Sequence, residues 1–298
     1  MPYSTTSRPA RSGCKAEVAS AKPSSLSNQL TVKFWGVRGS IPTPGESTTR
    51  YGGNTACVEV SVADQRLIFD GGTGLKVLGD HLHSKAQPID AHLFFTHTQW
   101  DRIQGFPFFL PAFMPGNRFK ICGAVAPNGA SIKQRLSEQM LRPNFPIPLQ
   151  AMRAKLEFCN LSAGSALQLG DVLVETIGLN PAANALGYRV SYQGHSLVYA
   201  TDTEHQTVDQ NLLYLAHQAD ILIYDGTYAD LEYPGLSSTG PKPWDTGLEL
   251  AQSAAVKQLI LFHHSPMQTD GALDELENIL KQRFPNVSLA QEGVSVVL

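Results

Sequence analysis

Hydrophobic and polar residues alternate in short runs from Leu30 onward. The run LTVKFWGVR has the period of two that is typical of a half-buried strand. TACVEVSV and RLIFD flank a short turn at residues 63–65, and this pattern predicts a hairpin. AHLFFTH is predicted as the next strand. The helical spacing of Ile132, Leu136 and Met140 predicts a helix at that place.

The second half of the chain repeats this mixture of elements. Strands are predicted at VLVETIGL, LGYRVSY, HSLVYATD, ADILIYD and VKQLILFHH, and helices at VDQNLLYLAHQ, WDTGLELAQSAA and DGALDELENILKQRF. Runs of strands with single helices between them predict mixed sheets whose outer faces are covered by helices. Because no linker interrupts this pattern, residues 30–298 are predicted as one domain.

The composition supports a large core and argues against two classes of partner. Of the 298 residues, 42% are hydrophobic and 16% are charged, with a formal net charge of −3. No long run of one charge is present, which argues against a broad basic face for nucleic acid. No apolar run approaches the roughly 18–20 residues that a membrane span requires.

The cysteines and residues 1–29 indicate the cellular compartment of the protein. The four cysteines form no CxxC pair, so we expect reduced thiols and a cytoplasmic protein. Residues 1–29 are rich in Ser, Pro, Ala and Thr and lack the apolar segment of a secretory signal. They predict a disordered tail. An organelle transit peptide is the alternative, because the segment is Ser-rich and poor in acidic residues.

Polar residues follow three of the predicted strands at the point where each strand ends. THTQWDR follows HLFF, TDTE follows SLVYA, and HHSP follows LILF. Strand-end loops of this kind often meet at one edge of a fold. Each cluster alone fits a capping Asp or a surface histidine. Together they predict a metal or acid–base site.

These motifs resemble those of the metallo-β-lactamase superfamily, in the branch of ribonuclease-Z-like and cyclic-phosphate phosphodiesterase-like proteins. The resemblance rests on FWGVRGSIPTPG, YGGNTACVEV, LIFDGGTGL, FFTHTQWDRIQGFPFF, LGYRVSY, VYATDTE and LILFHHSP. It implies a four-layer αββα sandwich with two metal ions, usually zinc, at one edge. It also implies that a metal-bound hydroxide attacks phosphorus or a carbonyl. One ion takes three histidines, the other takes an Asp and two histidines, and a second Asp bridges both.

Several of these ligand positions hold other residues here. The family motif HxHxDH reads HTQWDR from His97 to Arg102, so its second histidine is Gln99 and its third is Arg102. Pro181 stands where a further ligand is expected, and proline offers no donor. GPKPW stands where a helper histidine is often found.

Other positions keep the residues that the resemblance implies. Asp101 stands at the Asp of the motif, Asp202 matches the bridging carboxylate, and His263 matches the last histidine. Asp70, in the turn DGGTG, is expected to support the metal-site loop without binding metal. This turn has neither the GxxxxGK[ST] nor the GxGxxG pattern of a phosphate loop.

The remaining ligands are too few for two tightly held ions. The first ion would keep His97 and the shared Asp202, with Gln99 as a weak neutral donor, whereas zinc wants three or four good donors. The second would keep Asp101, Asp202 and His263. The site is therefore expected to hold no metal tightly, or one divalent ion such as zinc or manganese.

Arg102 changes the electrostatics of this site. Its permanent positive charge opposes a nearby divalent cation and favours pairing with carboxylates. We expect a buried ion pair with Asp202, Asp101 or both, in which Arg102 acts as an internal counter-ion. The alternative is that Arg102 extends into solvent and only its stem packs. His264, His195 and His205 are near in sequence but are not expected to replace the missing ligands.

The resulting hypothesis is an impaired or inactive homologue that binds a small anionic ligand or a protein partner. A metal-dependent phosphodiesterase acting on cyclic nucleotides or other phosphoesters is the alternative, with one ion and Asp101 as a catalytic residue. A structural subunit of a larger assembly is a third class. The sequence is compatible with a homodimer.

Overall fold

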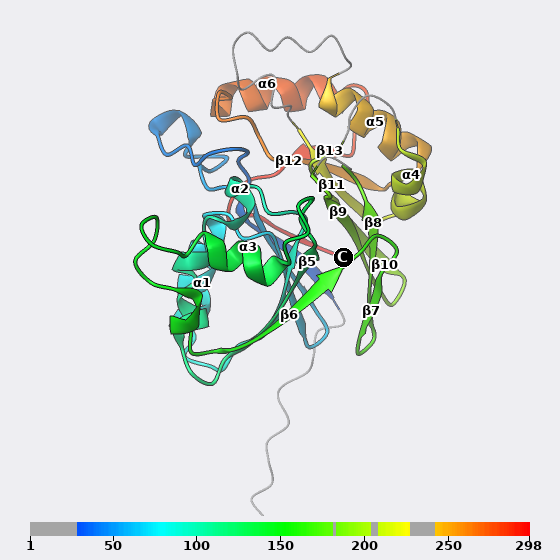
Figure 1. Cartoon of the computed structure of the whole chain (residues 1–298). Helices are drawn as coiled ribbons and strands as arrows, with labels where there is room; N and C mark the ends of the chain where they lie inside the picture. Colours follow the sequence, from blue (N-terminus) through cyan, green and yellow to red (C-terminus); the bar gives the residue numbers. More distant parts are fainter. Residues whose placement is uncertain (1–28, 181–182, 204–207, 227–241) are drawn as a thin grey trace, which may run out of the picture.

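The computed structural model describes residues 29–180, 183–203, 208–226 and 242–298 (Figure 1). Its strands form two seven-stranded sheets. The first sheet has the order β14 (Ser295–Val297), β1 (Leu30–Gly36), β2 (Cys57–Val62), β3 (Gln65–Phe69), β4 (Asp90–Phe95), β5 (Arg118–Ala124) and β6 (Lys155–Leu161). The second has the order β13 (Val287–Leu289), β12 (Gln258–Phe262), β11 (Ile221–Asp225), β10 (His195–Ala200), β9 (Leu186–Tyr192), β8 (Val172–Gly178) and β7 (Ala166–Leu169).

Helices cover the outer face of each sheet. They are α1 (Gly74–Ser84), α2 (Trp100–Ile103), α3 (Ile132–Glu138), α4 (Gln210–Ala216), α5 (Pro243–Ser253) and α6 (Asp270–Lys281), with 3-10 turns η1 (Glu46–Thr48), η2 (Phe106–Phe108), η3 (Leu110–Phe113) and η4 (Leu149–Ala151). Figure 1 shows α1 and α3 beside the first sheet and α4, α5 and α6 beside the second. The predicted four-layer αββα sandwich is confirmed.

The alternation of side chains along each strand builds these layers. In β3, Leu67 and Phe69 belong to the core between the sheets, whereas Ile68 belongs to the core beneath α1. In β11, Ile223 faces the inner core and Leu222 the core beneath α4 and α5. Because both faces of these central strands are buried, their sequences are apolar throughout.

Most of the predicted elements are present. The hairpin of β2 and β3 is confirmed, as are the helices at α3, α4, α5 and α6. The prediction did not include β5, β6, β7, β13, β14 or α1. The predicted tail, at residues 1–29, lies outside the described residues except at Gln29. None of the described helices combines the length and apolar character that a membrane crossing requires.

Candidate functional site

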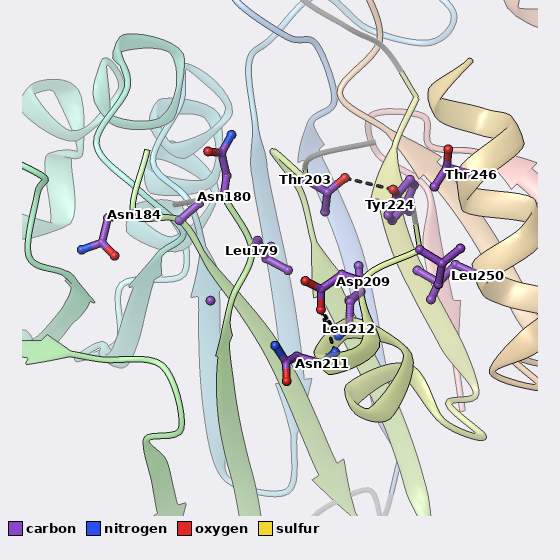
Figure 2. A pocket seen from close by; sticks show the side chains of 13 residues that line it. Leu179, Asn180, Asn184, Thr203, Asp209, Asn211, Leu212, Tyr224, Thr246 and Leu250 are labelled. Atoms are coloured by element: carbon purple, nitrogen blue, oxygen red, sulfur yellow. Dashed lines mark hydrogen bonds between the residues drawn. The ribbon is translucent and has the colours of Figure 1, made fainter. Parts of the chain in front are cut away.

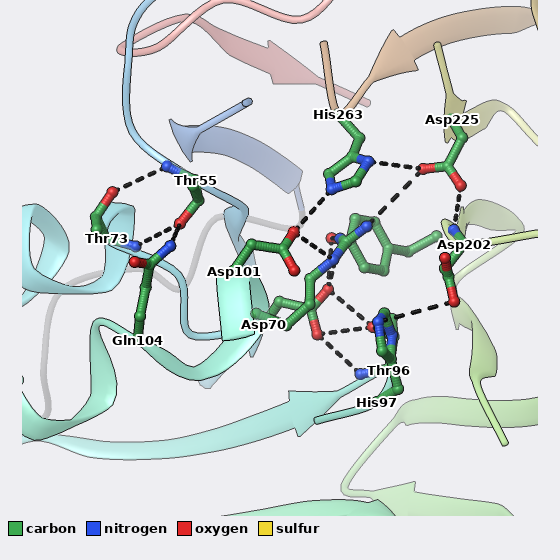
Figure 3. Close-up of polar contacts among 12 residues, drawn as sticks. Thr55, Asp70, Thr73, Thr96, His97, Asp101, Gln104, Asp202, Asp225 and His263 are labelled. Atoms are coloured by element: carbon green, nitrogen blue, oxygen red, sulfur yellow. Dashed lines mark hydrogen bonds and ion pairs between the residues drawn. The ribbon is translucent and has the colours of Figure 1, made fainter. Parts of the chain in front are cut away.

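Parallel strands bring the predicted polar clusters to one edge of the sandwich. β10, β11 and β12 are parallel neighbours, so their carboxyl ends lie side by side and present Asp202, Asp225 and His263. β3 and β4 are parallel in the other sheet and lead to Asp70 and to the loop that carries His97. Figure 3 shows these side chains converging from both sheets.

Backbone geometry at three strand ends is unusual. Asp70, Asp202 and His263 adopt left-handed φ angles of 60°, 62° and 60°. Such angles are disfavoured for residues with a Cβ, and they persist where the surrounding structure enforces them. Gly39 supports one of these residues, since a Cβ on it would lie 2.9 Å from the His263 ring. The fold therefore holds these three residues at the sheet edge in a backbone conformation that they would disfavour by themselves.

Arg102 lies at the centre of the polar cluster. Its side chain is 1% exposed, and Nη1 donates to Asp70 Oδ2 at 3.0 Å. Nε lies 3.4 Å from Asp101 Oδ2, and Nη2 lies 3.9 Å from Asp225 Oδ1. Of the two expected partners, Asp101 is confirmed, whereas Asp202 lies elsewhere, beside His97. The alternative in which Arg102 extends into solvent is wrong.

The charge of Arg102 is maintained by these neighbours. Burial alone lowers the pKa of a guanidinium, but Tyr199, Asp70 and Asp101 together raise the pKa of Arg102 above its usual value. The Tyr199 hydroxyl donates to Asp70 Oδ2 at 2.8 Å and accepts from Arg102 Nη1 at 3.2 Å. Arg102 therefore stays cationic.

Asp70 holds the start of the His97 loop through hydrogen bonds. It accepts hydrogen bonds from the Thr96 backbone N–H at 2.8 Å and from the Thr96 hydroxyl at 3.0 Å. Thr96 Oγ1 also lies 3.0 Å from His97 Nδ1. Asp70 thus connects the loop of β3, the start of the His97 loop and Arg102.

His263 and Asp101 form a second close pair. His263 Nε2 lies 2.8 Å from Asp101 Oδ2. Burial raises the pKa of Asp101, but the hydrogen bond from His263 and the charge of Arg102 outweigh burial and hold that pKa well below its usual range. His263 Nδ1 lies 3.8 Å from Asp225 Oδ1. Asp101 is therefore ionised, and it is paired with both His263 and Arg102.

His97 and Asp202 face each other on the other side of the site. His97 Nε2 lies 3.7 Å from Asp202 Oδ2, beyond hydrogen-bond distance. Both atoms are buried, and neither has a hydrogen-bond partner among the described residues. The backbone N–H of Asp202 donates to Asp225 Oδ2. An additional group between His97 and Asp202 would satisfy both atoms.

Asp225 is a site residue that sequence reasoning missed. It ends β11 and is 2% exposed, and it contacts Arg102, His263 and the Asp202 backbone. A carboxylate directly after an apolar strand was the available signal, the same signal that identified Asp202. Tyr199, within β10, carries no such signal, because its phenol reaches the site from an inner-core position.

The other predicted positions are less central. Gln99 is exposed, and Pro181 and His205 lie outside the described residues, as does the first part of GPKPW. His264 points away from the site, with Nε2 2.8 Å from the Ala290 carbonyl. His195 lies at the start of β10, 3.9 Å from Asp220. Neither His264 nor His195 joins the cluster, as predicted.

Two hollows open beside the cluster. His97 lines one of about 610 Å³, together with Trp100 and Arg135. The other, of about 390 Å³, adjoins Asp202 through Thr203, whose hydroxyl donates to the Tyr224 oxygen at 3.0 Å (Figure 2). A ligand in the first hollow would therefore contact His97, whereas none of the cluster residues lines the second.

The described residues offer no ready set of metal ligands. Within the described ranges, no three His, Cys, Asp or Glu side chains are placed so that they could jointly hold an ion. Arg102 occupies the space among Asp70, Asp101 and Asp225, while His97 and Asp202 supply two donors of the three or four that zinc needs.

Comparison with known proteins identifies the family. The sequence model of the beta-lactamase superfamily domain matches residues 32–264, which is most of the chain. The chain belongs to the metallo-β-lactamase superfamily. The two seven-stranded sheets with outer helices agree with the fold of this superfamily.

Relatives within the superfamily include ribonuclease Z proteins. The chain is 33% identical over 108 residues to ribonuclease Z of Prochlorococcus marinus (strain NATL1A), a match that covers 35% of this chain and 33% of that protein. It is 23% identical over 313 residues to ribonuclease Z of Thermoplasma volcanium, covering 91% of this chain and 99% of that protein. The chain thus aligns with about a third of the first relative and nearly all of the second.

A solved structure gives a similar fold. It is a diphosphatase from the PhnP family, with a TM-score of 0.66 and 16% identity, covering 91% of this chain and 97% of that chain. At this level of identity the likeness concerns the fold alone.

Proposed function

We propose that this chain is a non-hydrolytic member of the metallo-β-lactamase superfamily, in which Arg102 takes the electrostatic role of the metal ions. The observation that carries this proposal is the buried guanidinium of Arg102, held by the carboxylates of Asp70, Asp101 and Asp225. A divalent ion placed there would meet a fixed positive charge and would have to displace three ion-pair contacts. The residues therefore do not fit a two-metal centre.

The same geometry separates the residues that one ion would need. His263 is hydrogen-bonded to Asp101, while Asp202 faces His97. Among the described residues, no three His, Cys, Asp or Glu side chains are placed so that they could jointly hold one ion, and this supports the proposal over a one-ion site on Asp101, Asp202 and His263. In place of hydrolysis, the cluster would act as a rigid polar site at the sheet edge, which a partner would reach through the partly exposed side chains of Asp202 and His263.

The charge of the cluster bears on what it binds. The described site contains four carboxylates, one guanidinium and two imidazoles. Even with both imidazoles protonated, the four carboxylates outnumber the cationic groups and leave a net charge of −1. Of the two kinds of partner that the sequence leaves open, this balance favours a protein partner that presents a basic group over a small anion.

A residual hydrolase is the second candidate. It is favoured by one observation, the buried and unpartnered atoms His97 Nε2 and Asp202 Oδ2, which face each other across 3.7 Å. One divalent ion between them would satisfy both. The ribonuclease Z relatives are consistent with hydrolysis of a phosphoester.

A hydrolysis assay separates the two candidates. The full chain would be incubated with bis-p-nitrophenyl phosphate and with 2′,3′- and 3′,5′-cyclic nucleotides, each with added Mn²⁺ or Zn²⁺. We expect turnover at background for the wild type and for Asp202→Ala alike. Turnover that Asp202→Ala abolishes would establish the hydrolase and overturn the proposal. Inorganic phosphate should leave the melting temperature unchanged if the site disfavours small anions.

A further inference from the structure

A third hollow, which shares Trp100 and Gln139 with the hollow that His97 lines, lies on the other side of α2 from the Arg102 cluster. Trp100 and Gln104 are four residues apart, so they share one face of this short helix, whereas Asp101 and Arg102 lie on another. The hollow has a volume of about 510 Å³, and both Trp100 and Gln104 line it. Figure 3 shows Gln104 on the far side of Asp101 from His263.

The polar floor of this hollow is fixed by hydrogen bonds. Gln104 Nε2 donates to Thr55 Oγ1 at 3.0 Å. Thr55 and Thr73 exchange bonds, each backbone N–H donating to the other hydroxyl at 2.9 Å (Figure 3). Because these groups satisfy one another, they keep the shape of the hollow without a ligand.

Aromatic side chains form the walls and are exposed to water. Trp100 is 62% exposed and Phe108 is 58% exposed. Phe145 meets Phe108 edge to face, with ring centroids 5.4 Å apart. Exposed rings that border one hollow are typical of a binding site, because a flat ring entering it would remove their faces from water.

Gln139 adds an unsatisfied polar group to the same wall. Both its amide oxygen and its amide nitrogen are buried, and neither has a hydrogen-bond partner among the described residues. Buried polar atoms are usually paired, so this amide is a reason to expect a ligand. Gln139 lines the hollow, and no described residue bonds its amide, so a ligand in the hollow could supply the missing partners. An amide offers a donor and an acceptor side by side, and its complement is another amide.

The charge at the rim indicates an uncharged ligand. Among the described residues, Lys76 is the one cation that lines this hollow, and its Nζ already pairs with Asp80 Oδ2 at 2.6 Å. The described lining residues include no acidic side chain. An ionised ligand would therefore gain little from the rim and would lose hydration on entering between the rings.

We propose that this hollow binds an uncharged, flat aromatic molecule that carries a carboxamide or ring lactam. Its ring would lie against Trp100, Phe108 and Phe145, and its amide would pair with that of Gln139. The hollow continues past Phe108 into an apolar extension of about 560 Å³ that is lined by Leu110 and Ile147, among others. An apolar substituent on the ring would fit there. This proposal is independent of whether Arg102 excludes metal.

Two probes that differ in one group test the proposal. The full chain would be titrated with 2-naphthamide and with methyl 2-naphthoate, which keeps the rings and the acceptor but lacks the N–H donor. Binding would be followed by saturation-transfer and protein-observed NMR. We expect 2-naphthamide to bind at least about five-fold more tightly, the worth of one hydrogen bond.

Variants of the lining residues test whether the probes bind in this hollow. Gln139→Leu should remove the preference between the probes, and Phe108→Ala should weaken both by about five-fold or more. Tyr214→Ala, an exposed ring on α4, is the control and should change neither. The proposal is overturned if neither probe binds, if Gln139→Leu leaves the preference intact, or if decanamide binds more tightly than 2-naphthamide, which would indicate a channel for alkyl chains.

Discussion

The Nη1 atom of Arg102 donates to Oδ2 of Asp70 over 3.0 Å, and the two side chains are 1% and 0% exposed. An ion pair so completely removed from water depends on both members being present. Desolvation is costly for each charge, and the loss of one partner leaves the other buried and uncompensated. This pair therefore allows the role of Arg102 to be measured through stability.

Replacing Arg102 by Ala should destabilise the protein strongly. The change leaves the carboxylates of Asp70, Asp101 and Asp225 without their shared cation, and it opens a cavity. We expect the free energy of unfolding to fall by about 3–5 kcal/mol, measured by urea denaturation. A free energy equal to that of the wild type would refute the counter-ion role.

The matched control is Arg118, whose side chain is 58% exposed and whose Nε lies 3.7 Å from Asp90. Exposed pairs of this kind contribute little, because water screens them. Arg118→Ala should change the free energy of unfolding by less than about 1 kcal/mol. Equal losses at Arg102 and Arg118 would mean that burial of the pair has no special effect.

The segment that follows α2 should not tolerate a methyl group at Gly105. A Cβ there would lie 1.9 Å from the Gly72 carbonyl oxygen, so α2 would have to move away from the Asp70 turn. Gly105→Ala should cost at least about 3 kcal/mol, as expected for severe overpacking. Gly271→Ala, where a Cβ would lie 4.0 Å from the Thr269 hydroxyl oxygen, should cost nothing measurable when both variants are compared by thermal melts.

Stability should fall on mild acidification because of His264. Burial lowers the pKa of His264 to about 3. The unfolded imidazole has a pKa of about 6.5, so between about pH 6.5 and 3 the unfolded chain binds a proton that the folded chain refuses. The free energy of unfolding therefore decreases as pH falls through this window, by up to about 1.4 kcal/mol per unit.

A variant isolates this contribution. His264→Gln keeps a donor for the Ala290 carbonyl but does not titrate. Between pH 7.5 and 5.0 the wild type should lose about 2 kcal/mol more than the variant in urea denaturation. Identical losses would show that another group causes the pH dependence.

Much of the fold could be predicted because buried strands have apolar sequences. Leu67, Ile68 and Phe69 are apolar since β3 is buried on both faces. Helix α1 was missed because it contains two glycines. Close packing requires Gly79, since a Cβ there would lie 2.9 Å from the Phe109 ring. Helix propensities describe single residues and cannot predict such a contact.

The site was less predictable than the fold. The clusters at His97, Asp101, Asp202 and His263 could be found because each follows an apolar strand. Which of them pair could not, since left-handed backbone angles at Asp202 and His263 aim the side chains, and these angles are set by tertiary packing. The sequence therefore indicated an acidic partner for Arg102 but not the full set of three.

Restoring histidines at the family's ligand positions should increase the affinity for zinc. The variant Gln99→His, Arg102→His, Pro181→His removes the guanidinium and adds three imidazoles at the positions that the resemblance implies. We expect it to bind zinc more tightly than the wild type in chelator-competition titrations. Unchanged zinc affinity would show that Arg102 and the replaced ligands are not what sets metal binding.

Zinc content of the wild-type protein tests the central claim most directly. The full chain would be purified without chelator, dialysed against metal-free buffer and analysed by inductively coupled plasma mass spectrometry. Because Arg102 holds the carboxylates that ions would need, the account predicts much less than one zinc per chain. Two tightly held zinc ions per chain would contradict it.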